Sequence, residues 1–228
     1  MKELIELRQA SRIYNAGKQS LTALHPVDLV VHEGEFVCIA GPSGSGKTTL
    51  LNLIGGLDTP SAGEVSIAGE TTNGLSRRSS ARMRLDLLGF VFQTYNLIPV
   101  LTAYENVEYV LLLKGVPASE RKTRVTSALS RVGLEGQMIK FPREMSGGQQ
   151  QRVAVARAIV AAPPIVLADE PTANLDSSTG KDLMELLLGL NSEQKITFVF
   201  SSHDPVIIER ARRVVTLLDG RIASDVKC

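Results

Sequence analysis

The stretch Gly41-Pro42-Ser43-Gly44-Ser45-Gly46-Lys47-Thr48-Thr49 decides how the rest of the chain is interpreted. It fits the pattern G-x-x-x-x-G-K-[ST], in which the backbone N–H groups of a glycine loop surround phosphate oxygens. An apolar run at 36–40 precedes it and a mostly apolar run at 50–54 follows it, so a buried strand and a helix are expected on its two sides. That context favours a phosphate-binding loop over the alternative, a glycine-rich turn that binds nothing.

Two side chains of this loop have the chemistry that a bound triphosphate requires. Lys47 can place a positive charge between the β- and γ-phosphates, and the hydroxyl of Thr48 can bind Mg²⁺. The helix that begins at the loop adds the positive end of its dipole. The loop therefore predicts an α/β fold that binds a nucleoside triphosphate with Mg²⁺.

The composition limits the class of protein. The chain has 228 residues, of which 43% are hydrophobic and 21% charged, as in a large soluble domain or a domain with a lobe. A formal net charge of +1 favours neither nucleic acid nor an acidic surface as the partner. No apolar run approaches the roughly 20 residues of a membrane-spanning helix. Cys38 and Cys228 are far apart in the sequence and are expected to be reduced thiols.

Two adjacent carboxylates follow a second apolar run. Residues 165–168 predict a buried parallel strand, and Asp169 and Glu170 come directly after it. Because neighbouring residues of a strand point in opposite directions, the two acids should have different tasks. Asp169 can hold Mg²⁺ and Glu170 can polarise an attacking water molecule. The alternative is a solvated acidic turn.

Three further candidates rest on less specific patterns. Ser146-Gly147-Gly148 begins an expected helix, where it could bind an anion or only cap the helix. His203 follows an expected strand at 196–200, at the edge where ligands bind in open α/β sheets. Tyr14 comes after an expected extended segment at 3–9, and both adenine stacking and half-buried packing are open for it.

The middle of the chain is expected to be helical. Thr102-Ala103-Tyr104-Glu105 is a capping box that should begin one helix, and 118–132 should form another. We therefore expect residues 94–160 to form a helical lobe inserted in a single domain of residues 1–228. The stretch 77–84 holds four arginines, which are expected on a solvated helix face, with a nucleic-acid patch as the alternative.

Taken together, these segments closely resemble the ATP-binding cassette (ABC) ATPase family, from Tyr14 to an expected hairpin at 214–223. In that reading 41–48 is the Walker A loop and 165–169 is the Walker B strand. The resemblance implies a P-loop α/β fold with a RecA-like mixed sheet core, an antiparallel β subdomain and a helical subdomain. The chain departs from the family at Met145, where leucine is usual, and methionine is similar to leucine in volume.

The resemblance also implies roles for single residues, with ATP and Mg²⁺ bound together. The catalytic residues that it implies are Glu170, His203, Gln93 and Lys47. The Mg²⁺ site that it implies consists of Thr48, Gln93 and Asp169. The nucleotide contacts that it implies are Tyr14 on adenine, and Gly41, Pro42, Ser43, Gly44, Ser45, Gly46, Lys47, Thr48, Thr49, Ser146, Gly147, Gly148, Gln149 and Asp176.

In proteins of this family two cassettes pair head to tail, so that each ATP is held by the Walker A loop of one subunit and the Ser146–Gln149 segment of the other. The stretches 89–93, 96–99 and 101–107 are similar to the lipoprotein-releasing (LolD-type) and macrolide-exporter (MacB-type) subfamily. Its partners are membrane permeases like FtsX, MacB or LolC and LolE. This resemblance implies a peripheral ATPase on the cytoplasmic face of the bacterial inner membrane.

Two other functional classes stay open at this stage. The first is an FtsE-like signalling ATPase, which switches a membrane partner that regulates envelope hydrolases and moves no cargo. The second is an ABC ATPase acting on nucleic acid or ribosomes, but such proteins usually carry two cassettes or long coiled-coil inserts. Neither feature is present in this sequence, so nucleic acid is not expected as a partner.

Overall fold

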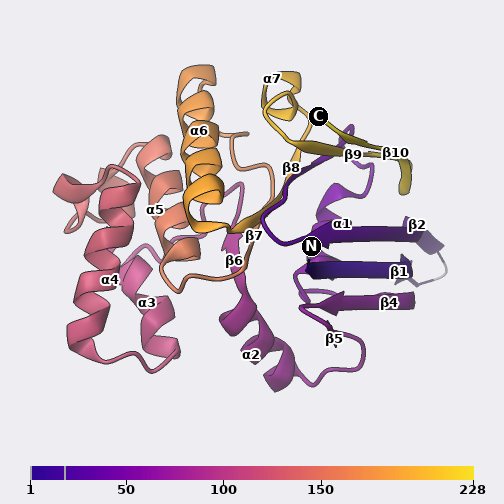
Figure 1. The fold of residues 1–228 in the computed structure, drawn as a ribbon, viewed down its shortest axis with the longest axis horizontal. Helices are drawn as coiled ribbons and strands as arrows, with labels where there is room; N and C mark the ends of the chain where they lie inside the picture. The colour runs from indigo at the N-terminus through magenta and orange to yellow at the C-terminus, as the bar shows by residue number, and fades with distance from the viewer. Residues whose placement is uncertain (1, 18) are drawn as a thin grey trace.

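Within residues 2–17 and 19–228, which the computed structural model describes, the chain forms two β-sheets (Figure 1). The core sheet has the strand order β10-β9-β3-β8-β7-β6, and the outer sheet has the order β2-β1-β4-β5. The strands are β1 (Glu3–Ala16), β2 (Gln19–His32), β3 (Phe36–Ala40), β4 (Ala62–Ile67), β5 (Glu70–Thr71), β6 (Leu88–Val91), β7 (Ile165–Ala168), β8 (Thr197–Ser202), β9 (Arg213–Leu218) and β10 (Arg221–Lys227).

The core sheet is mixed, as the resemblance to the ABC ATPase family implies. Its strands β9, β3, β8, β7 and β6 pair in parallel, whereas β10 pairs with β9 in antiparallel as a hairpin. The parallel strands β3, β7 and β8 are buried on both faces, which explains their almost continuous apolar sequence. Phe36 and Phe198 pack on one face, and Val37 and Val199 pack on the other.

Helices cover both faces of the core sheet. They are α1 (Lys47–Ile54), α2 (Arg77–Leu87), α3 (Ala103–Leu113), α4 (Ala118–Arg131), α5 (Gly147–Ile159), α6 (Ser177–Gln194) and α7 (Pro205–Ile208), with short 3₁₀ turns at Glu135–Gln137 and Pro142–Glu144. Helices α3, α4 and α5 pack together on the side of the core strands away from the outer sheet (Figure 1). Among the described residues, the helices include none with the length and apolar character needed to cross a membrane.

Local sequence signals account for the main helix ends. Glu105 N donates to Thr102 Oγ1 at 3.2 Å and Thr102 N donates to Glu105 Oε2 at 2.8 Å, so the predicted capping box begins α3. The strand expected at 3–9 is longer, because β1 continues to Ala16 as one side of a hairpin with β2. Register shifts beside Gln9, whose φ is 47°, interrupt the alternation of polar and apolar residues from which strand length is predicted.

The C-terminal hairpin is fixed to the rest of the fold by Arg213. The guanidinium of this buried residue donates to both Asp225 carboxylate oxygens at 2.8 and 2.7 Å, to Glu35 Oε2 at 2.7 Å and to Val30 O at 2.8 Å. These hydrogen bonds from Arg213 lower the pKa of Asp225 from its ordinary value of 3.8, although partial burial opposes the shift. The ionised Asp225 therefore stabilises the folded state.

This ion pair gives a pH-dependent prediction for Asp225→Asn. Because the folded pKa of Asp225 lies below the unfolded one, its contribution is complete above pH 3.8 and is lost as the pH falls through the folded value. We expect the variant to be about 1 kcal/mol less stable than the parent at pH 6, a small value because Asp225 is partly exposed and screened. Urea unfolding at pH 6, 4 and 3 should show this difference shrinking towards the most acidic sample. A constant difference over that range would contradict the ion-pair account.

Candidate active site

A cavity of about 510 Å³ opens beside the loop between β3 and α1. It lies where the core strands β3, β7 and β8 end, which is the usual position for ligands in open α/β sheets. The residues that line it are Tyr14, Leu21, Thr22, Ala23, Ser43, Gly44, Gly46, Lys47, Thr48, Thr49, Gln93, Glu170 and His203. The structure thus brings together candidates from five separate stretches of the sequence.

The loop itself can adopt its conformation only with glycine at two positions. Gly41 has a φ of 150°, and a Cβ there would lie 2.3 Å from the carbonyl oxygen of Leu217. Gly46 has a φ of 101°, and a Cβ there would lie 2.6 Å from the carbonyl oxygen of Ala23. The missing side chains let the loop pack against β9 and β2 while its backbone turns round the cavity, as a phosphate cradle requires.

Lys47 places a buried positive charge in this loop. Its side chain is 7% exposed, and its Nζ donates to the carbonyl oxygens of Gly41 at 2.8 Å and Pro42 at 3.0 Å. The same Nζ lies 3.4 Å from Glu170 Oε1. A buried ammonium group needs oxygen partners, and the triphosphate of a nucleotide offers several.

Asp169 faces the loop from the end of β7. Thr48 Oγ1 donates to its Oδ2 at 3.0 Å, and Ser201 Oγ donates to its Oδ1 at 2.6 Å. A carboxylate beside a hydroxyl at the entrance to a phosphate cradle is the hard-oxygen donor set that Mg²⁺ prefers. The residues present therefore fit a Mg²⁺ ion bound together with a triphosphate. Thr48 and Gln93 line the cavity itself, and Asp169 lies next to it through its contact with Thr48.

Glu170 faces a different set of partners, as the alternation along the strand predicts. Its backbone has a φ of 45°, and its carboxylate oxygens lie 2.9 and 3.0 Å from Nδ1 of His203. Its backbone N–H donates to Ser201 Oγ at 2.8 Å, so one hydroxyl contacts both acidic residues. A carboxylate that is held by a histidine beside the cavity can accept a proton from water.

The segment Ser146–Gln149 and Asp176 are not among the described residues that line this cavity. Ser146 begins α5 with a capping box, in which Gln149 N donates to Ser146 Oγ at 3.3 Å and Ser146 N donates to Gln149 Oε1 at 3.0 Å. Asp176 caps α6, and hydrogen bonds from Ser178 and Thr179 hold the pKa of its carboxyl far below the usual range. Within one chain these residues therefore cap the N-termini of α5 and α6, away from the cavity.

Two supporting residues have no signal in the sequence. Arg157 on α5 donates to the carbonyl oxygens of Tyr95 at 2.8 Å and Asn96 at 2.5 Å, in the loop after Gln93. Tyr95 and Asn96 both have positive φ values, 59° and 49°, so a single guanidinium holds a strained turn. Asn174 Nδ2 donates to the carbonyl oxygen of Gln93 at 2.9 Å. Ser201 has a local signal, because it lies at the end of β8, two residues before His203.

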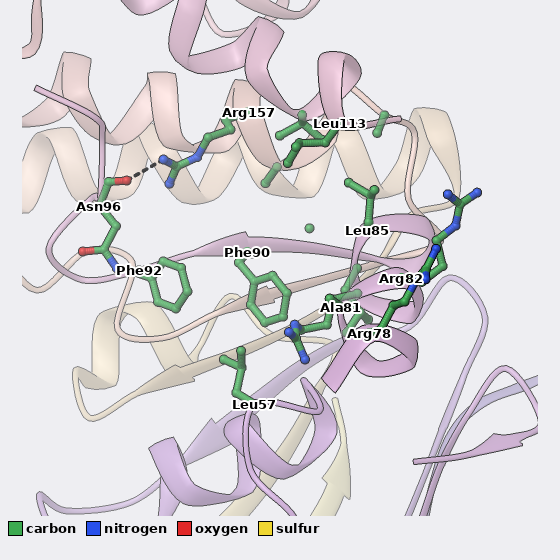
Figure 2. A pocket seen from close by; sticks show the side chains of 16 residues that line it. Leu57, Arg78, Ala81, Arg82, Leu85, Phe90, Phe92, Asn96, Leu113 and Arg157 are labelled. Atoms are coloured by element: carbon green, nitrogen blue, oxygen red, sulfur yellow. Dashed lines mark hydrogen bonds between the residues drawn. The ribbon is translucent and has the colours of Figure 1, made fainter. Parts of the chain in front are cut away.

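A second, larger hollow of about 760 Å³ lies between α2, β6, α3 and α5, and we call it the arginine-rimmed groove (Figure 2). Its lining consists of Leu57, Arg78, Ala81, Arg82, Arg84, Leu85, Leu88, Gly89, Phe90, Phe92, Asn96, Val110, Leu113, Arg157, Ala158 and Ala161. The rings of Phe90 and Phe92 are stacked, with 5.8 Å between their centroids and an interplanar angle of 4°. Figure 2 shows these rings between Arg157 on one side and Arg78 and Arg82 on the other.

Known proteins are similar to this chain in sequence over nearly its whole length. A family model described as ABC transporter matches residues 24–173. The ABC transporter ATP-binding protein YtrE of Bacillus subtilis is 46% identical over 221 residues, which cover 95% of this chain and 96% of YtrE. The macrolide export ATP-binding/permease protein MacB of Escherichia coli is 45% identical over 225 residues, which cover 99% of this chain and 35% of MacB.

A solved structure has the same fold. The ATP-binding cassette MJ0796, a protein of Methanocaldococcus jannaschii, is described there as a dimer in a post-hydrolysis state bound to ADP and Pi. It matches with a TM-score of 0.92 and 45% identity, covering 98% of each chain. The family model and these relatives show that the chain belongs to the ABC transporter family, as an ATPase cassette that binds ATP with Mg²⁺.

Proposed function

We propose that this chain hydrolyses ATP at the cavity beside the β3–α1 loop, with Glu170 as the general base. In this reaction water attacks the γ-phosphorus in line, the P–O bond to ADP breaks, and the water proton passes to Glu170. His203 would orient that carboxylate, and the 2.9 Å contact between the two side chains is the observation that carries the assignment. Lys47 and the loop from Gly41 to Thr49 would bind the phosphates, and Tyr14 would stack on the adenine.

The metal would be held by Thr48 and Asp169, with Gln93 beside them. When bound, Mg²⁺ supplies charge neutralisation for the phosphate oxygens and a fixed orientation of the γ-phosphate. The protein contributes the positions of these oxygen atoms through the hydrogen bonds of Thr48 and Ser201 to Asp169. The position of Gln93 would depend on two hydrogen bonds. Asn174 donates to the carbonyl oxygen of Gln93, and Arg157 donates to that of Tyr95 in the loop that follows.

We also propose that two copies act together, each completing the other's site with Ser146–Gln149 and Asp176. Two observations support this arrangement. Both segments lie outside the cavity of their own chain, although Ser146–Gln149 forms a helix start suited to an anion. The related cassette MJ0796 is described as a dimer.

The partner that we propose is a membrane permease of the export type, with the chain bound to the cytoplasmic face of the membrane. MacB is named as an ATP-binding/permease protein, and this supports a permease partner for the present chain. The arginine-rimmed groove would receive an amphipathic segment of that permease, with apolar side chains on Phe90 and Phe92 and carboxylates on the arginines. In this arrangement residues 94–160 act as a helical lobe that carries the groove's far wall.

This partner can be tested with the double variant Leu57→Asp/Leu113→Asp. Both leucines are exposed and line the groove, so two buried carboxylates in the bound state should cost at least about tenfold in affinity for an apolar segment. The measurement is affinity purification of the tagged chain from gently solubilised native membranes, followed by mass spectrometry. The parent should retain a permease and the variant should lose it, while thermal unfolding of the two stays similar.

Leu218→Asp is the matched control, because Leu218 is equally exposed but lies on β9 outside the groove. It should retain the permease. Retention by the groove variant, or recovery of ribosomal proteins or nucleic acid from the parent, would contradict the proposal. A permease that associates with envelope hydrolases and moves no cargo would instead assign the chain to FtsE-like signalling.

A further inference from the structure

The ring of Tyr14 is held by two charged side chains that the hydrolysis chemistry does not use. The guanidinium carbon of Arg12 lies 4.6 Å from the centroid of the ring, over one of its faces. The Tyr14 hydroxyl donates to Asp58 Oδ2 at 2.8 Å. Arg12 Nη2 lies 2.7 Å from Asp58 Oδ1, so the three side chains form a closed triangle.

The backbone brings these three residues together from two separate segments. Arg12 and Tyr14 are two residues apart on β1, and alternation along a strand places them on the same face. Asp58 belongs to the turn after α1, the helix that begins at the phosphate-binding loop. Its Oδ1 also accepts a hydrogen bond from the backbone of Thr59 at 2.8 Å, so the carboxylate has few other orientations.

The turn that carries Asp58 is itself attached to β1. Ser61 N donates to the carbonyl oxygen of Ser11 at 2.7 Å, and Ile13 N donates to Ser61 Oγ at 3.0 Å. The Arg12 and Asp58 side chains are 22% and 19% exposed, so solvent screens this ion pair less than it screens a pair on the open surface. The triangle is therefore a fixed support for the ring.

We propose that Arg12 and Asp58 are positioning residues for the base of the bound nucleotide. Arg12 covers one face of the Tyr14 ring by a cation–π contact, and Asp58 holds the hydroxyl by a hydrogen bond. The ring therefore has a fixed orientation in the wall of the cavity before the nucleotide binds. Ordering one mobile side chain during binding lowers affinity by about 2- to 12-fold. Because the triangle already orders Tyr14 in the free protein, ATP binding does not have to overcome this cost. This inference rests on the proposed stacking of Tyr14 on adenine.

A purely structural role would have a different signature, because it would not depend on the base. Inorganic tripolyphosphate carries the phosphate chain of ATP and no base, so it reports the loop from Gly41 to Thr49 alone. Calorimetric Kd values with Mg²⁺ for both ligands separate the two roles. We expect Asp58→Ala and Arg12→Ala to bind ATP about 2- to 12-fold more weakly than the parent, and to bind tripolyphosphate with unchanged affinity.

The chain offers a matched control in Arg8→Ala. Arg8 lies on the same strand and pairs with Glu6 at 2.7 Å, but its side chain is 68% exposed and the pair is separate from the triangle. This variant should bind both ligands like the parent. Tyr14→Phe keeps the ring and removes only the hydroxyl contact with Asp58, so it should reproduce the ATP effect of Asp58→Ala even if the alanine variant does not fold.

The Tyr14→Ala background separates the outcomes. There Asp58→Ala should cause no further loss of ATP affinity, because Asp58 acts through the ring. Equal losses for ATP and tripolyphosphate would overturn the inference in favour of a structural role. If Tyr14→Ala weakens ATP binding while Asp58→Ala, Arg12→Ala and Tyr14→Phe do not, only the positioning role fails. If Tyr14→Ala leaves ATP binding unchanged, the stacking role of Tyr14 fails as well.

Discussion

Glu170→Gln is expected to lower steady-state ATP hydrolysis by about 10²- to 10⁴-fold, the usual loss on removing a general base. The amide keeps the shape of the side chain but accepts no proton from water. Because Glu170 also lies 3.4 Å from Lys47 Nζ, its neutral replacement should leave ATP affinity the same or slightly higher. Phosphate release at saturating Mg·ATP and an equilibrium ATP-binding measurement test the two parts separately.

The same variant should favour an ATP-dependent dimer, since the nucleotide that bridges two copies is no longer consumed. Size-exclusion chromatography with and without ATP measures this shift. Glu193→Gln is the control, because it makes the same substitution at an exposed position of α6 that does not line the cavity. This variant should hydrolyse ATP at the parental rate. Turnover near the parental rate in Glu170→Gln would exclude Glu170 as the base and leave His203 as the next candidate.

Lys47→Ala should have the second large effect, on binding instead of turnover. A hydrogen bond to a charged group contributes about 1.5–3 kcal/mol, so losing two such bonds to phosphate oxygens should weaken ATP binding by about a hundredfold or more. The variant also removes the donor to the carbonyl oxygens of Gly41 and Pro42, so the loop loses part of its own support. Calorimetric titration with Mg·ATP measures the loss.

Lys122→Ala is the control for Lys47→Ala, because Lys122 is an exposed lysine on α4. It should bind ATP like the parent. Lys47→Arg keeps the positive charge but brings a larger planar group into a buried position, so it should recover little of the affinity. Parental affinity in Lys47→Ala would show that the nucleotide does not bind at this loop.

The central part of the site could be predicted from the sequence because its signals are local. The glycine loop between an apolar strand and a helix gave the P-loop fold, and two acids after a second apolar strand gave Asp169 and Glu170 with different partners. Parallel strands in one sheet bring such strand ends together, which explains why Lys47 lies beside Glu170 in the structure.

The supports of the site could not be predicted, because their partners are distant in the sequence and follow no fixed spacing. Arg157 holds carbonyl oxygens more than sixty residues earlier, and backbone acceptors leave no trace in side-chain identity. Asp58 contacts Tyr14 from the turn after α1, which Ser61 attaches to β1. The arginine-rimmed groove combines α2, β6, α3 and α5, whose relative placement depends on tertiary packing.

The Ser201 hydroxyl, which joins Asp169 to the backbone of Glu170, has a consequence for redesign. This single oxygen on β8 donates to the Asp169 carboxylate and accepts from the Glu170 backbone N–H, so it fixes two successive residues that follow β7. Any change in the spacing of these two strands would displace both acids at once. A backbone change in β7 or β8 would therefore alter the positions of both acids together, whereas exchange of one side chain, such as that of Glu170, alters one of them alone.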